Sequence, residues 1–179
     1  MVEYSAQKFD HAASQFQANR PGLMQGHYNH IPQLARLGLD RAIGSMIGVV
    51  GDPRNEKYFF GNFGLAVSAV TKGTEAFLSK NIQVGTTRDF SGRNASGFFA
   101  SDHVGRILVN PATISRFPVA SVPVELTHEG VHLARGTAPS AYGDAAEYEA
   151  MRTGAGMGRA LGLRVTLPPM DQVHTEYGY

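Results

Sequence analysis

The chain has 179 residues, 42% of them hydrophobic, which is enough for one compact domain with a buried core. Its formal net charge is +1, from 16 basic and 15 acidic residues, and no basic run is dense enough to follow a phosphate backbone, so nucleic acid is not expected as a partner. It has no Cys, which excludes disulfides, a thiol nucleophile and thiolate metal sites. Any metal would need His and carboxylate ligands.

The N-terminal part is predicted to be helical. Apolar residues recur at helical spacing from Ser5 to about Asn19, and the Arg-Pro-Gly sequence at 20–22 is expected to end this helix. A second helix is predicted from Pro32 to Val50. Its expected apolar face consists of Leu34, Leu37, Ile43, Met46 and Ile47. No secretory signal and no apolar run of membrane-spanning length is visible, so membrane insertion is not expected.

The middle of the chain contains the predicted strands. Residues 59–79 fit either one helix interrupted by Gly73 or a strand followed by a turn. Segments 81–87 and 105–111 are predicted strands, since each is bounded by polar, Gly or Pro residues. A further short strand is predicted at 98–101, after a polar loop.

Two helices are predicted in the last third. Ser121 is the expected N-cap of the first, Pro123 is acceptable in its first turn, and Gly136 is expected to end it. The second should begin at Asp144 and run to about Leu161. Helices, a few strands and two further helices predict an α+β fold.

The first of these helices contains the motif His-Glu-x-x-His. His128 and His132 are four residues apart, so both rings leave the same helix face and can reach one metal ion at about 2.0–2.1 Å. Glu129 lies one step round the helix and is the expected general base for a metal-activated water. The alternative is a surface helix with hydrogen-bonded histidines. Such a motif would occur by chance in roughly one such sequence per hundred.

A catalytic zinc site needs a third protein ligand. Glu147 and Glu149 point about 200° apart around a helix, so at most one of them can face the metal. We favour Glu147, one turn into the last helix, although it also completes a capping box with Asp144. Glu149 and His174 stay open as alternatives.

Two other motifs are not expected to be sites. The histidines of "GHYNH" at 26–30 lack an accompanying acid. The sequence "GAGMG" at 154–158 lies in mid-helix and follows no strand, so close helix packing explains it better than phosphate binding.

The segments "ELTHEGVHLARG" and "EYEAMRTGAGMGRALGLR" resemble the zincin metallopeptidases, and more narrowly the compact bacterial effector and polymorphic-toxin metallopeptidases. The resemblance covers Ile107 to Arg164. It implies that Zn²⁺ is the cofactor, that Glu147 is the third ligand, and that residues 107–109 form the edge strand along which a substrate peptide lies. There are two departures: the Gly154-Ala155 pair stands where such helices often carry Glu-Asn, and Gly130 is less apolar than the residue usual after the glutamate.

The resulting expectation is a single zincin-like α+β domain over 1–179, with a helical part at 1–58 and a catalytic core at 59–179. The core should hold a small mixed sheet, an active-site helix and a following ligand-bearing helix. The substrate should contact Ile107, Leu108 and Val109. Tyr142, in the loop between the last two helices, is a candidate oxyanion donor, although a solvent-facing loop tyrosine is the simpler interpretation.

The expected function is that of a zinc-dependent endopeptidase, with Glu129 as general base. The resemblance implies an effector or toxin that is secreted, or delivered into a target cell, without a cleavable signal peptide. Expected partners are a protein or peptide substrate and, as further candidates, an immunity or carrier protein. Two alternatives remain: a zinc amidase acting on cell wall, and a non-catalytic binding module whose metal is structural.

Overall fold

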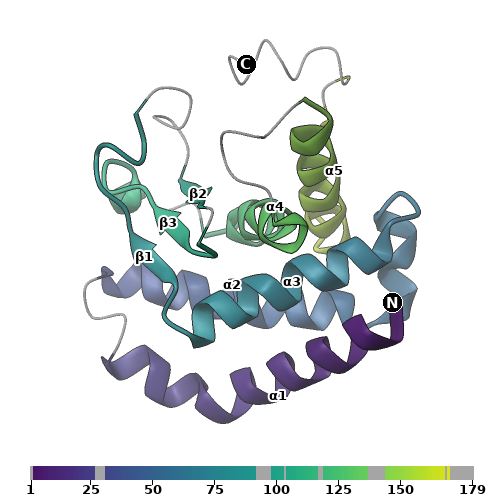
Figure 1. Ribbon diagram of the computed structural model, residues 1–179, viewed down its shortest axis with the longest axis horizontal. Coiled ribbons are helices and arrows are strands. Elements are labelled where there is room, and N and C mark those ends of the chain that lie inside the picture. Colours follow the sequence, from purple (N-terminus) through teal and green to yellow (C-terminus); the bar gives the residue numbers. More distant parts are fainter. Residues whose placement is uncertain are drawn as a thin grey trace.

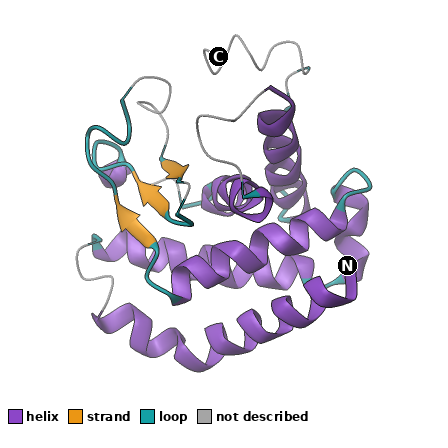
Figure 2. Ribbon diagram, in the orientation of Figure 1, coloured by secondary structure: helices purple, strands orange, loops and turns teal. Residues whose placement is uncertain are grey.

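The structure is a computed structural model that describes residues 2–26, 31–91, 98–102, 104–116, 119–136, 144–167 and 169. Within these residues the chain is an α+β fold of five α-helices and one small mixed sheet, as the sequence predicts. In the view of Figure 2 the sheet lies on the left, with the α-helices below it and to its right. No helix among the described residues combines the length and apolar character needed to cross a membrane.

Helix α1 (Val2–Gly26) is longer than predicted. The Arg-Pro-Gly sequence at 20–22 does not end it, and that prediction is wrong. A proline inside a helix costs about 3 kcal/mol locally. Arg20, next to this proline, helps to offset the cost: it donates three hydrogen bonds of 2.7, 3.0 and 2.6 Å to the Asp40 carboxylate of the neighbouring helix, and its guanidinium lies over the Phe16 ring. Tertiary contacts therefore outweigh the local signal.

Helix α2 (Gln33–Val50) has nearly the predicted bounds. The short helix η1 (Pro53–Tyr58) comes next in the chain. Ile43 and Met46 are fully buried, as expected, whereas Leu37 is 41% exposed and does not belong to the apolar face. Leu39, two residues further on, is buried instead. The side chain of Leu34 is outside the described part of the structure.

Helix α3 (Phe63–Leu78) settles the ambiguous segment as one helix. Asn62 caps it by accepting a hydrogen bond from the Leu65 amide at 3.3 Å. Gly73 lies inside this helix and faces the Met46 side chain. Nine residues of α3 are buried, so packing against its neighbours stabilises the helix despite the glycine.

The sheet contains β1 (Ile82–Val84), β2 (Phe99–Ser101) and β3 (Ile107–Val109) in the order β1-β3-β2. Strand β3 pairs with β1 in parallel and with β2 in antiparallel fashion. It is therefore the central strand. The prediction that 107–109 form an edge strand for a substrate peptide is wrong, because both of its sides are already paired.

Helices α4 (Val122–Arg135) and α5 (Asp144–Ala160) agree with the predicted bounds. Figure 1 shows α4 at the centre of the molecule, with the sheet on one side, α5 on the other and α3 beneath it. Gly136 ends α4 in the left-handed conformation, with φ +64°. Ser121 precedes the first turn as predicted, but its hydroxyl contacts Glu125 at 3.2 Å instead of capping the helix.

The main core joins α1, α2 and α3 to the sheet and to the inner faces of α4 and α5. Its largest fully buried side chains are Phe16, Phe77, Ile31, Leu39, Ile43, Met46, Ile82, Ile107, Leu126, Met157 and Val70. The helical N-terminal part is thus packed into the same core as the sheet, and it supports α4 from below.

Candidate metal centre

Three side chains from α4 and α5 converge on one point. The Nε2 atoms of His128 and His132 lie 3.2 Å apart, and each also lies 3.2 Å from an oxygen of Glu147. Their ligand atoms all lie within 4.8 Å of one another, and the three residues together could hold a metal ion. The structure therefore brings together the two predicted histidines and the favoured third ligand.

The spacing of these atoms agrees with a tetrahedral metal. Ligand atoms placed at 2.0–2.1 Å around a tetrahedral zinc ion lie about 3.3–3.4 Å from each other. The Nε2–Nε2 separation of 3.2 Å is close to this value, and the two Glu147 oxygens each lie 3.2 Å from one ring, Oε2 from His128 and Oε1 from His132. Glu147 Oε2 is buried and, within the described residues, makes no hydrogen bond of acceptable geometry despite its contact with His128. A cation between the three groups would satisfy this oxygen.

The environment of Glu147 favours its charged form. The residue is only 4% exposed, and burial alone would raise the pKa of its carboxyl. The two histidine rings overcome this effect and hold the pKa of Glu147 well below its usual range. Glu147 is therefore ionised at neutral pH, as a metal ligand would need to be.

His128 is more accessible than its partner. Its side chain is 18% exposed, whereas that of His132 is 2% exposed. Burial opposes a charge on the His128 ring, but Glu147, Glu129 and Glu125 together raise its pKa above the ordinary value. Three carboxylates thus favour a cation at this position, whether it is a proton or a metal ion.

The alternative ligand Glu149 has another partner. Arg135, at the end of α4, donates hydrogen bonds of 3.0 and 2.6 Å to the two Glu149 oxygens. This bidentate pair joins α4 to α5 on the outside of the site. Glu149 is thus excluded from the three-residue group and helps to hold Glu147 opposite the histidines. His174 is outside the described residues.

Glycines allow the helices around the site to approach closely. A methyl group on Gly130 would overlap the carbonyl of Ala69 in α3, and one on Gly154 would lie 2.8 Å from the Val124 carbonyl and 3.6 Å from the His128 Cβ. Gly156 and Gly158 are similarly close to other segments. Close packing is confirmed as the role of the "GAGMG" sequence. Gly130 and Gly154 are thus positions where the neighbouring backbone leaves room only for glycine.

Glu129 immediately follows His128 and is half-buried. A step of one residue turns about 100° around the helix, so Glu129 lies beside the three-residue group and is not one of its members. Its carboxylate contributes to the electrostatic field at His128. This is the position expected of a general base.

The sequence reasoning missed Glu125, one turn before Glu129 on α4. Burial, with a smaller contribution from the neighbouring Glu129, raises the pKa of Glu125 to about 7, against the opposing effects of the Ser121 hydrogen bond and of His128. The signal was present in the sequence, since Glu125, Glu129 and the two histidines share one side of the helix at spacings of three and four.

Three of the other predicted site residues are not brought to this centre. Ile107, Leu108 and Val109 are buried in the central strand. Tyr142 is outside the described residues.

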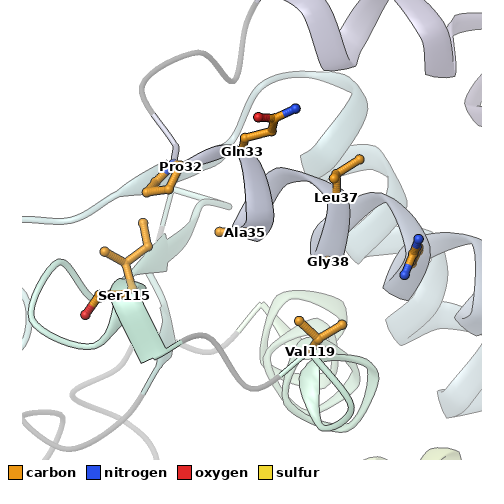
Figure 3. A pocket seen from close by; sticks show the side chains of 9 residues that line it. Pro32, Gln33, Ala35, Leu37, Gly38, Ser115 and Val119 are labelled. Atoms are coloured by element: carbon orange, nitrogen blue, oxygen red, sulfur yellow. The ribbon is translucent and has the colours of Figure 1, made fainter.

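A separate hollow of about 430 Å³ lies between the first half of α2 and residues 114–119 (Figure 3). It is lined by Pro32, Gln33, Ala35, Leu37, Gly38, Arg41, Ile114, Ser115 and Val119, and so includes none of the residues of the candidate metal centre.

Comparison of the chain with protein-family models, with curated proteins and with solved structures finds no match. The candidate metal centre is therefore interpreted from its own geometry and chemistry.

Proposed function

We propose that the chain is a zinc-dependent endopeptidase with a zincin-like core. The observation that carries the proposal is the convergence of His128, His132 and Glu147 on one point, with Glu129 beside it. Two imidazoles and one carboxylate are a donor set that zinc accepts, and catalytic zinc sites keep three protein ligands with one open position. Among the described residues no fourth His, Asp or Glu joins the group.

Zinc bound there would supply a Lewis acid that lowers the pKa of water and polarises a substrate carbonyl. Glu129 would accept a proton from the water that attacks the carbonyl carbon. It would then return this proton to the nitrogen of the leaving amine, so that one C–N bond is broken and one C–O bond is formed. His128, His132 and Glu147 would hold their positions throughout, because α4 and α5 are joined by close packing and by the Arg135–Glu149 pair.

Glu129→Gln tests this role most directly. We expect it to retain zinc and to lose hydrolysis of a quenched-fluorescence peptide library by at least about 100-fold, which is the lower range for removal of a general base. Glu56→Gln, an exposed carboxylate change on η1, is the matched control and should leave the rate unchanged.

Full activity in Glu129→Gln would contradict the proposal. Hydrolysis of purified cell wall by the wild type, without cleavage of any library peptide, would instead favour the amidase. The family resemblance supports a delivered effector or toxin as the setting of this activity.

A further inference from the structure

One aromatic side chain lies between two arginines outside the metal centre. The guanidinium carbons of Arg152 and Arg159, both on α5, lie 4.9 and 5.0 Å from the ring centre of Phe60. The arginines are seven residues apart, which is two helical turns or about 10.5 Å along the axis. They therefore leave the same side of α5, and the Phe60 ring lies between them.

Phe60 is held at the surface in a disfavoured conformation. Its φ is +53°, in the left-handed region that a bulky L residue rarely adopts, and its side chain is 40% exposed. The preceding loop is fixed on α5 at Gly156, where an added methyl group would lie 2.7 Å from the Tyr58 carbonyl. The adjacent Phe59 is buried in the core, so the chain presents one of two consecutive phenylalanines to solvent.

Within the described residues, neither arginine forms an ion pair with a carboxylate. Four other arginines each form an ion pair with a carboxylate: Arg20, Arg54, Arg106 and Arg135. Arg152 and Arg159 form none, and Arg159 makes only a long hydrogen bond of 3.4 Å to the Val165 carbonyl. A guanidinium stacked on a ring keeps its N–H groups directed outward in its own plane, where they can bind carboxylates in bidentate fashion.

Further groups of the same kind continue this surface. The Tyr148 ring lies 5.9 Å from the Arg152 guanidinium, and on η1, which packs against α5, Lys57 lies over the Tyr58 ring at 5.2 Å. We call the set Tyr148, Arg152, Phe60 and Arg159 the arginine–aromatic patch.

We propose that the arginine–aromatic patch binds an acidic segment of polypeptide belonging to the substrate. Acidic side chains two or three residues apart in an extended chain are about 7–10 Å apart, which fits two guanidinium groups on either side of one ring. The patch is too short to follow a phosphate backbone, and the net charge of the whole chain is only +1. These features favour an acidic polypeptide over nucleic acid.

The patch and the metal centre share helix α5. Tyr148 directly follows Glu147, while Arg152 and Arg159 lie about 7.5 and 18 Å further along the axis and partly round the helix. An extended peptide advances about 3.3–3.6 Å per residue, so the axial distances alone correspond to acidic residues about two to six positions from the cleaved bond. This assignment to the substrate rests on the proposed peptidase function, whereas binding to the patch does not.

Fluorescence anisotropy with a fluorescein-labelled deca-glutamate peptide tests the binding. The protein is kept metal-free with a chelator, so that catalysis does not enter the measurement. We expect salt-sensitive binding that is at least tenfold weaker in Arg152→Gln/Arg159→Gln. The matched control is Arg88→Gln/Arg116→Gln, which removes the same charge from exposed arginines outside the patch and should bind as the wild type does.

Three results would overturn the inference: no preference of the wild type for deca-glutamate over deca-glutamine, equal weakening in both double variants, or equal binding of a ten-nucleotide thymidine strand. If the double variant does not fold, Arg152→Gln and Arg159→Gln singly should each weaken binding, and wild-type affinity in both would overturn it as well. If the zinc-loaded enzyme cleaves peptides but deca-glutamate binding does not depend on the patch, the inference about the patch is overturned and the peptidase is not. Patch-dependent binding without any hydrolysis would overturn the peptidase, and with it the assignment of the acidic segment to a substrate, but not the binding of acidic polypeptide by the patch.

Discussion

At the residue scale, the candidate metal centre depends on which carboxylate of α5 faces His128 and His132. The spacing of four residues places His128 and His132 on one face of any helix. The choice between Glu147 and Glu149 depends on how α5 is rotated against α4, which a single sequence does not encode locally. The Arg135–Glu149 pair is the contact that decides it.

Glu125 provides a test of the electrostatics around the site. Its pKa is raised to about 7 by burial and by Glu129, from an ordinary value of 4.5. The folded chain therefore holds a proton on Glu125 that the unfolded chain releases, and this contribution to stability is lost as pH rises from about 4.5 through 7. Glutamine does not ionise, so the variant Glu125→Gln should not lose this stability as the pH rises.

The free energy of unfolding of the metal-free wild type should fall by about 2 kcal/mol more than that of Glu125→Gln when the pH is raised from 5 to 8. Urea unfolding at the two pH values measures this difference. The control Glu56→Gln, on the exposed side of η1, should change the free energy of unfolding by a similar amount at pH 5 and at pH 8. A wild type and a Glu125→Gln variant whose difference in stability is the same at both pH values would contradict the assigned environment.

At the element scale, α4 is positioned by backbone contact with α3. The sequence showed Gly130 only as a departure from the apolar residue usual at that place. In the structure it is the point where the two helices meet, since any side chain there would overlap the Ala69 carbonyl. The requirement for glycine at position 130 comes from Ala69 of α3, which is distant in the chain, so the residues next to Gly130 in the sequence give no sign of it.

Gly130→Ala should destabilise the protein by about 2 kcal/mol or more, because a methyl group must separate α3 from α4. Gly48→Ala is the matched control: Gly48 is an exposed helical glycine with no atom within 4 Å of an added methyl group, so alanine there should stabilise by up to about 1 kcal/mol. Chemical unfolding of the three proteins measures both changes. Equal stability of Gly130→Ala and wild type would be inconsistent with the close crossing.

The two wrong predictions about elements have physical explanations of the same kind. A strand of three apolar residues gives no sign of how many partners it has, so 107–109 could be recognised as a strand but not as the central one. Residues 20–22 carry a strong local stop signal, and it is overridden by the contact between Arg20 and Asp40.

At the scale of the whole molecule, the helical part at 1–58 supports the region that carries the candidate metal centre. The helical secondary structure of this part could be predicted, because long amphipathic patterns are the most reliable local signals. Its packing could not, because the contacts that place α1 against α2 and α3 join residues distant in the chain. The pair of Arg20 and Asp40 is the main polar contact described between α1 and α2.

Asp40→Asn should lower the free energy of unfolding by about 1–3 kcal/mol, because Asp40 is 8% exposed and its loss leaves the Arg20 charge without its partner. Glu75→Gln, which breaks the exposed pair with Lys72, should change it by less than about 0.5 kcal/mol. If both variants lost the same small amount, α1 would not be held in the manner described.

The central claim is that His128, His132 and Glu147 together hold one metal ion, and its most direct test is the zinc content of the purified protein by elemental mass spectrometry. We expect one zinc per chain in the wild type and in Glu149→Gln, and none in His128→Ala or Glu147→Gln. A wild type that contains no zinc and takes up none when zinc is added would contradict the claim. So would a Glu147→Gln variant that still holds one zinc per chain.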